Sequence, residues 1–185
     1  GFFTKPIVLL LVGALLLRLG LASFGTLLID QNTFIAWGRN ASAGGFSRFY
    51  NGWSDYLPGY IYVLSFLSRI ESILPIGQTV LYKLPAILAD IAAGYLVYDI
   101  VKKLKNEKAA LFGSSFVLLN PAFIANSTLW GQVDILTALF AALSIYLLPK
   151  RWYLSAICLA VGAIIKPQAA LAAPVILTMM VQMKM

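Results

Sequence analysis

Isolated charged residues interrupt an otherwise apolar chain, and they are the residues best able to do chemistry. Asp30 is the first charge after a long apolar run, and no basic residue lies within eight positions of it. The chain has no histidine, so a carboxylate is the natural group to take a proton from a hydroxyl. We therefore predict that Asp30 is a general base. The alternative is that Asp30 only caps the segment that follows the apolar run.

Further acidic and polar residues are candidates to bind a substrate. Asp134 stands in the stretch NSTLWGQVDIL, two positions after Gln132. Both side chains could form hydrogen bonds with a polar substrate. A carboxylate at the start of a helix is also a common N-terminal cap, because the helix dipole favours negative charge there. Both roles stay open for Asp134. Asp55 is a third acidic candidate.

Three basic residues are candidates to bind an anion: Lys166, Lys83 and Arg48. Cations stabilise negative charge that develops in a reaction. Either lysine could instead extend its ammonium group to the membrane surface. Two other charges lie within apolar runs, and we expect Arg18 to pair with Asp90.

The composition indicates an integral membrane protein. Of its 185 residues, 61% are hydrophobic and 11% are charged, against about 25% charged in soluble proteins. The net charge of +7 comes from basic residues between apolar segments, so it reports orientation in a membrane and not nucleic-acid binding. The absence of histidine excludes most zinc sites. We expect neither a metal nor a cofactor, because lysines can neutralise a phosphate.

The apolar segments predict an all-α polytopic membrane protein with about six spanning helices. The expected spans are residues 6–29, 79–101, 109–125, 133–149, 152–165 and 168–183. Residues 30–56 are too polar to cross a membrane. Residues 57–74 are apolar and aromatic, and they could either cross the membrane or lie in its interface.

The basic loops assign the two sides of the membrane. KKLKNEK, at 102–108, is the strongest basic loop and is expected on the cytoplasmic side. Lys5 and the pair Lys150–Arg151 fall on the same side only if residues 57–74 do not cross. Residues 30–78 then form one long extracytoplasmic loop that contains an interfacial helix.

This topology gathers several candidate residues near the outer face. The predicted fifth segment has 14 residues and is roughly 21 Å long, shorter than the hydrocarbon core of about 30 Å. Helix ends that stop below the membrane surface would leave a water-filled pit. We expect four side chains to line that pit: Asp134, Gln132, Trp130 and Lys166.

Several segments, taken in order, are similar to one family. Asp30 is followed by Trp37, and then come DYLPGYIYVL, YKLPAILADI, LNPAFIANSTLWGQVDIL and IIKPQAALAAP. This pattern resembles the C-superfamily membrane glycosyltransferases, which use polyprenyl-phosphate sugar donors. Within them it is similar to bacterial and archaeal mannosyltransferases related to the second mannosyltransferase of GPI-anchor synthesis. The family's DYPP proline pair is here Leu57–Pro58.

The resemblance implies a membrane module with a long first outer loop and an extracytoplasmic active site. It implies transfer of a sugar, with mannose expected, from the lipid-phosphate donor to a hydroxyl of a glycan, lipid or protein. It places the catalytic carboxylate at Asp30 and implies that Lys166, with Lys83 or Arg48, binds the donor phosphate. The residues expected to bind substrate are Asp55, Trp37, Tyr56, Gln132 and Asp134.

The resemblance also bears on the chain as a whole. We expect residues 1–185 to be a single transmembrane glycosyltransferase module that forms the N-terminal part of a longer chain. The membrane would be a bacterial or archaeal plasma membrane, or the endoplasmic reticulum membrane in a eukaryote. Membrane lipid is an expected partner, and nucleic acid is not.

A secondary transporter, or another ion-coupled carrier, is the alternative function. It would use the same charges as an ion or proton relay. Transporters of this kind usually contain two related halves and place charges near the middle of the membrane. The sequence shows no internal repeat, and its charges lie toward one face, so we favour the transferase.

Overall fold

The computed structural model describes residues 5–184, and every regular element among them is a helix. The all-α prediction is therefore confirmed for this part of the chain. The elements are α1 (Pro6–Leu21), α2 (Leu28–Gly44), α3 (Phe46–Phe49), α4 (Pro58–Ile70), α5 (Gln78–Leu104), α6 (Glu107–Leu118), α7 (Pro121–Phe123), η2 (Ile124–Trp130), α8 (Asp134–Leu147), α9 (Trp152–Ile165), η3 (Pro167–Ala172) and α10 (Ala173–Gln182).

The helices form two compact units. The first is the chain up to Phe34 together with Glu71–Ile135, and the second is Ile35–Ile70 together with the chain from Leu136 onward. The structure does not test the expectation of a single functional module, which stays a prediction.

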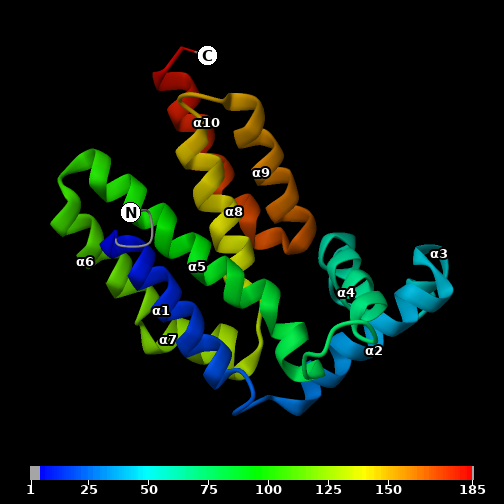
Figure 1. Cartoon of the computed structure of the whole chain (residues 1–185). Coiled ribbons are helices and arrows are strands. Elements are labelled where there is room, and N and C mark those ends of the chain that lie inside the picture. Colours follow the sequence, from blue (N-terminus) through cyan, green and yellow to red (C-terminus); the bar gives the residue numbers. More distant parts are fainter. Residues whose placement is uncertain (1–4, 185) are drawn as a thin grey trace. The chain divides into compact units, whose positions relative to one another are not determined.

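The long helix α5 organises the first unit, and α1 and α6 lie along it (Figure 1). Gly94 of α5 lets α6 come close, because a Cβ there would lie 2.5 Å from the side chain of Leu118. Ser114 of α6 donates a hydrogen bond of 2.9 Å to the carbonyl oxygen of Gly94. A small residue at such a contact is typical of helices that pack closely in membranes.

Two helical stretches among the described residues are long and apolar enough to cross a membrane. They are Gln78–Leu104, with 27 residues, and Glu107–Trp130, with 24. Four shorter apolar stretches are Pro6–Leu21, Asp134–Leu147, Trp152–Ile165 and Pro167–Gln182. These six stretches lie where the spans were predicted. That all six cross a membrane stays a prediction.

The predicted first span, residues 6–29, is wrong at its C-terminal end. Helix α1 stops at Leu21, and α2 begins at Leu28. Gly25, between them, has a φ of 60°, in the left-handed region that L side chains rarely adopt, so the chain turns there. Hydropathy does not distinguish such a turn from a continuing helix, because the residues around it are apolar. Helix α2 continues into the stretch that was expected only as a polar loop.

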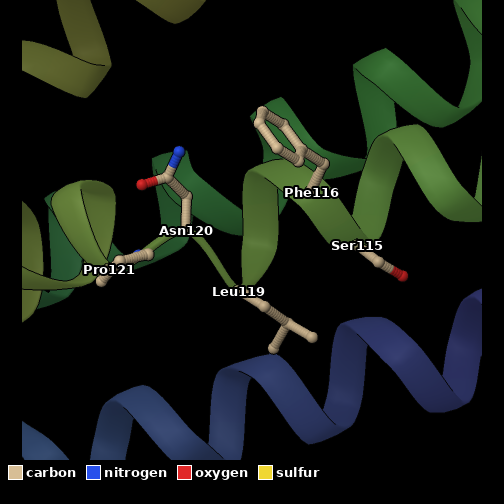
Figure 2. Close-up of a pocket in the computed structure, with 5 residues that line it drawn as sticks. All are labelled: Ser115, Phe116, Leu119, Asn120 and Pro121. Carbon is tan, nitrogen blue, oxygen red and sulfur yellow. The ribbon is translucent and has the colours of Figure 1, made fainter.

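The predicted third span, residues 109–125, is broken at Pro121. Proline lacks the amide hydrogen that would continue helix α6. The Asn120 side chain accepts a hydrogen bond of 2.9 Å from the Ala122 amide and starts the next turn. Figure 2 shows a shallow pocket at this break, with the ring of Phe116 and the amide of Asn120 on the same side of the ribbon. No residue of the predicted site lines this pocket.

In the second unit, α4 packs against α9, and α9 packs against η3. A Cβ added at Gly59 of α4 would lie 2.6 Å from the carbonyl oxygen of Ile164 in α9, so only glycine permits this contact. Helix α4 has 13 residues, which give roughly 20 Å, less than the hydrocarbon core. Its length agrees with the interfacial interpretation of residues 57–74, which stays a prediction.

Candidate functional site

The Asp30 carboxylate lies in the first turn of α2 and receives two hydrogen bonds in the first unit. The indole Nε1 of Trp130 donates to Oδ2 over 2.7 Å, and the amide Nε2 of Gln132 donates to the same oxygen over 2.6 Å. The structure thus brings together residues that are about a hundred positions apart in the sequence. The predicted pit lined by Asp134, Gln132, Trp130 and Lys166 stays a prediction, and the contact of Trp130 and Gln132 with Asp30 was not predicted.

The two donors orient the carboxylate. Both bonds end on Oδ2, so neither of them uses Oδ1. Hydrogen bonds to a carboxylate are short and strong compared with those between neutral groups. The position of Asp30 in the first turn of α2 also places it at the positive end of the helix dipole. One carboxylate oxygen is therefore anchored and the other can face a substrate.

A π-helix, which is a rare helical form, places Trp130 and Gln132 beside Asp30. Residues Ile124–Trp130 form a π-helix that ends at Gly131, whose φ is 92°. The amides of Gly131 and Gln132 both donate to the carbonyl oxygen of Asn126, over 3.1 and 2.9 Å. Single π-turns occur frequently at functional sites. Hydropathy gave no sign of this π-helix, and the one sequence signal was a glycine directly after a tryptophan.

Lys83 differs from its expected role as a phosphate ligand. Its side chain is 0% exposed, and its ammonium group donates to four oxygens. These belong to the carbonyls of Ala22, Gly25 and Leu129 and to the hydroxyl of Thr26. An ammonium group has three donors, so these acceptors engage all of them. These contacts do not favour the phosphate role of Lys83, which stays a prediction.

Asp134 is the exposed first residue of α8. Its Oδ2 lies 3.4 Å from the Asn126 side-chain nitrogen. This position at a helix start fits capping, and its exposure fits contact with a substrate. Both roles stay open for Asp134.

The expected pair of Arg18 and Asp90 is confirmed. The guanidinium Nε lies 2.8 Å from Asp90 Oδ2, and both side chains are buried. Arg18 Nη1 also donates to the Leu118 carbonyl oxygen over 2.8 Å, and Ser127 donates to Asp90 Oδ2. This network joins α1, α5, α6 and η2 and serves the packing of the first unit.

Aromatic side chains form a cluster in the second unit. Trp37 is 8% exposed, and its ring lies 5.6 Å from the rings of both Trp53 and Tyr56. Trp53 is 74% exposed. The ammonium group of Lys166 lies 4.9 Å from the centroid of the Tyr56 ring, a cation–π contact. Three predicted site residues, Trp37, Tyr56 and Lys166, thus lie within one cluster.

Asp55 and Arg48 are the remaining predicted site residues of the second unit, and both are exposed. Asp55 precedes Tyr56, and Arg48 is in α3. Tyr50 donates a hydrogen bond of 3.3 Å to the Tyr56 carbonyl oxygen. Desolvation and the neighbouring Tyr62 raise the pKa of Tyr50 above its usual value, so it remains a neutral donor at physiological pH.

Among residues 5–184, no group of three acidic, cysteine or histidine side chains is arranged to hold a metal ion. Metal independence stays a prediction, since a substrate phosphate can itself supply metal ligands.

Comparison with known protein families matches residues 58–184 to the dolichyl-phosphate-mannose-protein mannosyltransferases. The chain belongs to this family. The match covers more than half of the sequence and confirms the resemblance to membrane glycosyltransferases. No curated protein and no solved structure matches the chain.

Membership in this mannosyltransferase family favours the transferase over the transporter. The matched range includes Trp130, Gln132 and Lys166. Asp30 and Trp37 precede it, so their assignment depends on their contacts and on the motif order of the sequence. The all-helical structure and its long apolar helices agree with a membrane-embedded member of the family.

Proposed function

We propose that this protein transfers a mannosyl group from a polyprenyl-phosphate donor to an acceptor hydroxyl at the extracytoplasmic face of a membrane. The acceptor would be a glycan, a lipid or a protein. The family membership supports the class of reaction. The contact of Asp30 with Trp130 and Gln132 supports the choice of base.

The proposed step is a substitution at the anomeric carbon of the sugar. The acceptor oxygen forms a bond to that carbon while the bond between the carbon and the phosphate oxygen breaks. The phosphate leaves with the bonding electron pair, and Asp30 takes the hydroxyl proton through Oδ1. General base catalysis of this kind contributes typically 10²–10⁴-fold.

The aromatic cluster of the second unit, taken by itself, is the proposed binding region for the donor. Lys166, whose ammonium group contacts the Tyr56 ring, is the proposed phosphate ligand. Arg48 is a further predicted cation of this unit. The exposed Trp53 is better placed than the buried Trp37 to stack on a sugar ring. Asp55, Gln132 and Asp134 remain candidates to bind sugar or acceptor hydroxyls.

The function is tested with the full-length protein in lipid nanodiscs and a panel of polyprenyl-phosphate sugars. We expect release of polyprenyl phosphate and labelling of an acceptor with the mannosyl donor. Movement of an ion or solute across a proteoliposome membrane, without any release of lipid phosphate, would support the transporter instead.

The base is tested by Asp30→Asn. Asparagine can still accept hydrogen bonds from Trp130 and Gln132, but it cannot take the hydroxyl proton as a carboxylate does. We expect kcat to fall on the order of 10²-fold or more, with unchanged thermal stability.

The matched control for Asp30→Asn is Asp99→Asn, which removes a carboxylate paired with Lys103 near the C-terminal end of α5. We expect normal turnover from it. An Asp30→Asn protein that keeps most of its activity would assign Asp30 to capping and move the search for the base to Asp55 or Asp134.

A further inference from the structure

Two turns of the chain meet at the ammonium group of Lys83. The first turn follows α1, and the second lies at the end of the π-helix η2. From the first, the ammonium group binds the carbonyl oxygens of Ala22 at 2.9 Å and Gly25 at 2.8 Å, and the hydroxyl of Thr26 at 3.1 Å. The second turn includes the last two residues of η2, Leu129 and Trp130, and from it the ammonium group binds the carbonyl oxygen of Leu129 at 2.9 Å. One buried charge therefore ties together backbone segments that are about a hundred residues apart.

The same two turns carry the proposed base and its two donors. The first turn leads into α2, which carries Asp30 in its first turn. The second turn carries Trp130 and Gln132, whose side chains both bind Asp30 Oδ2. The relative position of the two turns thus decides whether these three side chains can meet.

Glycines let both turns approach the lysine. At Gly131, with a φ of 92°, a Cβ would lie 3.3 Å from Lys83 Cγ and 3.3 Å from Gln31 Oε1. At Gly25, with a φ of 60°, a Cβ would lie 3.4 Å from the Cβ of Leu129. The turns are in direct contact, and the lysine chain fills the space beside Gly131.

We propose that Lys83 is a positioning residue for Asp30, acting through the backbone of these two turns and not by touching the substrate. This inference rests on the proposed function, in which Asp30 is the base. A buried charge is costly unless hydrogen bonds satisfy it, and four acceptors do so here. Its loss would leave the two turns without their shared donor and would let Asp30 move away from Trp130 and Gln132.

The first test is Lys83→Met, which keeps the length of the side chain and removes the ammonium group. We expect kcat to fall about 10²-fold, because small displacements of a reacting group have effects of that size. The KM for the lipid donor should stay within about twofold, since Lys83 touches no substrate. Lys102→Met, at the C-terminal end of the same helix, is the matched control with normal kcat. An unchanged kcat, or a raised donor KM with normal kcat, overturns the proposal.

The second test combines Lys83→Met with Asp30→Asn. If Lys83 acts through Asp30, the double variant should be no more than about threefold slower than Asp30→Asn alone. If Lys83→Met lowers the kcat of Asp30→Asn as much as it lowers the kcat of the wild type, Lys83 has a general structural role and the proposal is overturned. The proposed function fails separately, when Asp30→Asn alone retains most of the activity.

The third test replaces the lysine link with a covalent one. Gly25→Cys and Leu129→Cys, in a Cys158→Ala background, place two Cβ atoms close to the ~3.8 Å that disulfides prefer. A cysteine at the φ of 60° of Gly25 strains the turn, so the same cysteine pair with Lys83 present is the reference for kcat. Oxidation of this pair should restore kcat in Lys83→Met at least tenfold, and reduction should remove the gain. The disulfide should also form more slowly in Lys83→Met than with Lys83 present, a readout independent of activity. Failure of the formed disulfide to restore kcat overturns the proposal.

Gly131→Ala serves as a second variant should Lys83→Met not fold. It keeps the ammonium group, but alanine at a φ of 92° strains the second turn and presses a methyl group against Lys83 and Gln31. We expect the same selective fall in kcat with unchanged donor KM, and a normal kcat would contradict the positioning role.

Discussion

At the scale of single residues, the charges of this apolar chain fall into two groups. Arg18, Lys83 and Asp90 are buried, and each is bonded to an opposite charge or to carbonyl oxygens. Asp30 and Lys166 are partly exposed. An ionisable side chain at membrane depth costs roughly 2.5–3.5 kcal/mol on insertion scales. In the first group, hydrogen bonds and an ion pair offset that cost. The side chains of the second group are accessible from outside the protein.

Removing the Lys166 ammonium group should weaken use of the lipid donor. We expect Lys166→Ala to raise the donor KM by roughly tenfold or more, because a hydrogen bond to a charged group contributes about 1.5–3 kcal/mol. Lys166→Arg should be only partly tolerated, since a planar guanidinium differs from a compact ammonium. Steady-state kinetics against donor concentration measures both, with Lys150→Ala as control. Normal donor kinetics in Lys166→Ala would leave Lys166 with only its contact to Tyr56.

Breaking the Arg18–Asp90 pair should destabilise the first unit. Asp90→Ala leaves a buried guanidinium without its carboxylate, and we expect a loss of about 3–5 kcal/mol in the free energy of unfolding. Unfolding in detergent, followed by circular dichroism, measures the change. The double variant Arg18→Leu with Asp90→Ala should recover part of the loss, because it leaves no unpaired charge. Equal stability of Asp90→Ala and wild type would contradict this assignment.

At the scale of elements, close contacts through glycine place the site residues. Gly94 brings α6 against α5, and Gly59 brings α4 against α9. The contact between α4 and α9 matters for the aromatic cluster of the second unit, because α4 begins two residues after Tyr56 and α9 ends one residue before Lys166. The distance between Tyr56 and Lys166 therefore depends on how closely these two helices pack.

Gly59→Ala should separate α4 from α9. The added methyl group would lie 2.6 Å from the backbone oxygen of Ile164, which cannot move without its helix. We expect a loss of about 1–3 kcal/mol in stability, as for other overpacked contacts, together with a raised donor KM. Thermal unfolding and donor kinetics measure the two effects. Gly13→Ala is the matched control, because a Cβ at Gly13 meets no atom within 4 Å and alanine favours a helix. Equal behaviour of the two variants would show that the α4–α9 contact is not tight.

At the scale of the whole molecule, the distribution of basic residues predicts how the chain crosses the membrane. The short loop between α5 and α6 begins with Lys105, and it lies between the lysines that end α5 and Lys108 in the first turn of α6. Basic loops of this kind remain on the cytoplasmic side. The segment between α1 and α5, which carries Asp55 and the aromatic cluster, is then extracytoplasmic.

Cysteine labelling from the two sides of the membrane measures this topology. In a Cys158→Ala background, Ser54→Cys should react with an impermeant thiol reagent added from outside. Asn106→Cys should react only after the membrane is opened. Labelling of both positions from the same side would reverse the topology and would remove the proposed site from the extracytoplasmic face.

The sequence by itself determined the class of protein and most of its helices. Apolar composition and the length of each apolar run are local properties, and they predicted α5 and α9 to within a few residues. Motif order also pointed to the family that the comparison confirms. The turn at Gly25 escaped prediction because it lies within an apolar run. The polar stretch before Asp134 predicted a break between spans but not a π-helix, because hydropathy carries no information on which backbone groups hydrogen-bond.

Only the tertiary structure decided what each isolated charge does. Lys83 and Lys166 look alike in the sequence, each a single lysine beside an apolar helix and close to a proline. Packing surrounds the first with backbone carbonyls and sets the second over the Tyr56 ring. The partners of Lys83 lie 46 to 61 positions away, and those of Asp30 lie 100 and 102 positions away. No local pattern records such pairs, because they form only when whole helices pack and bring their ends together.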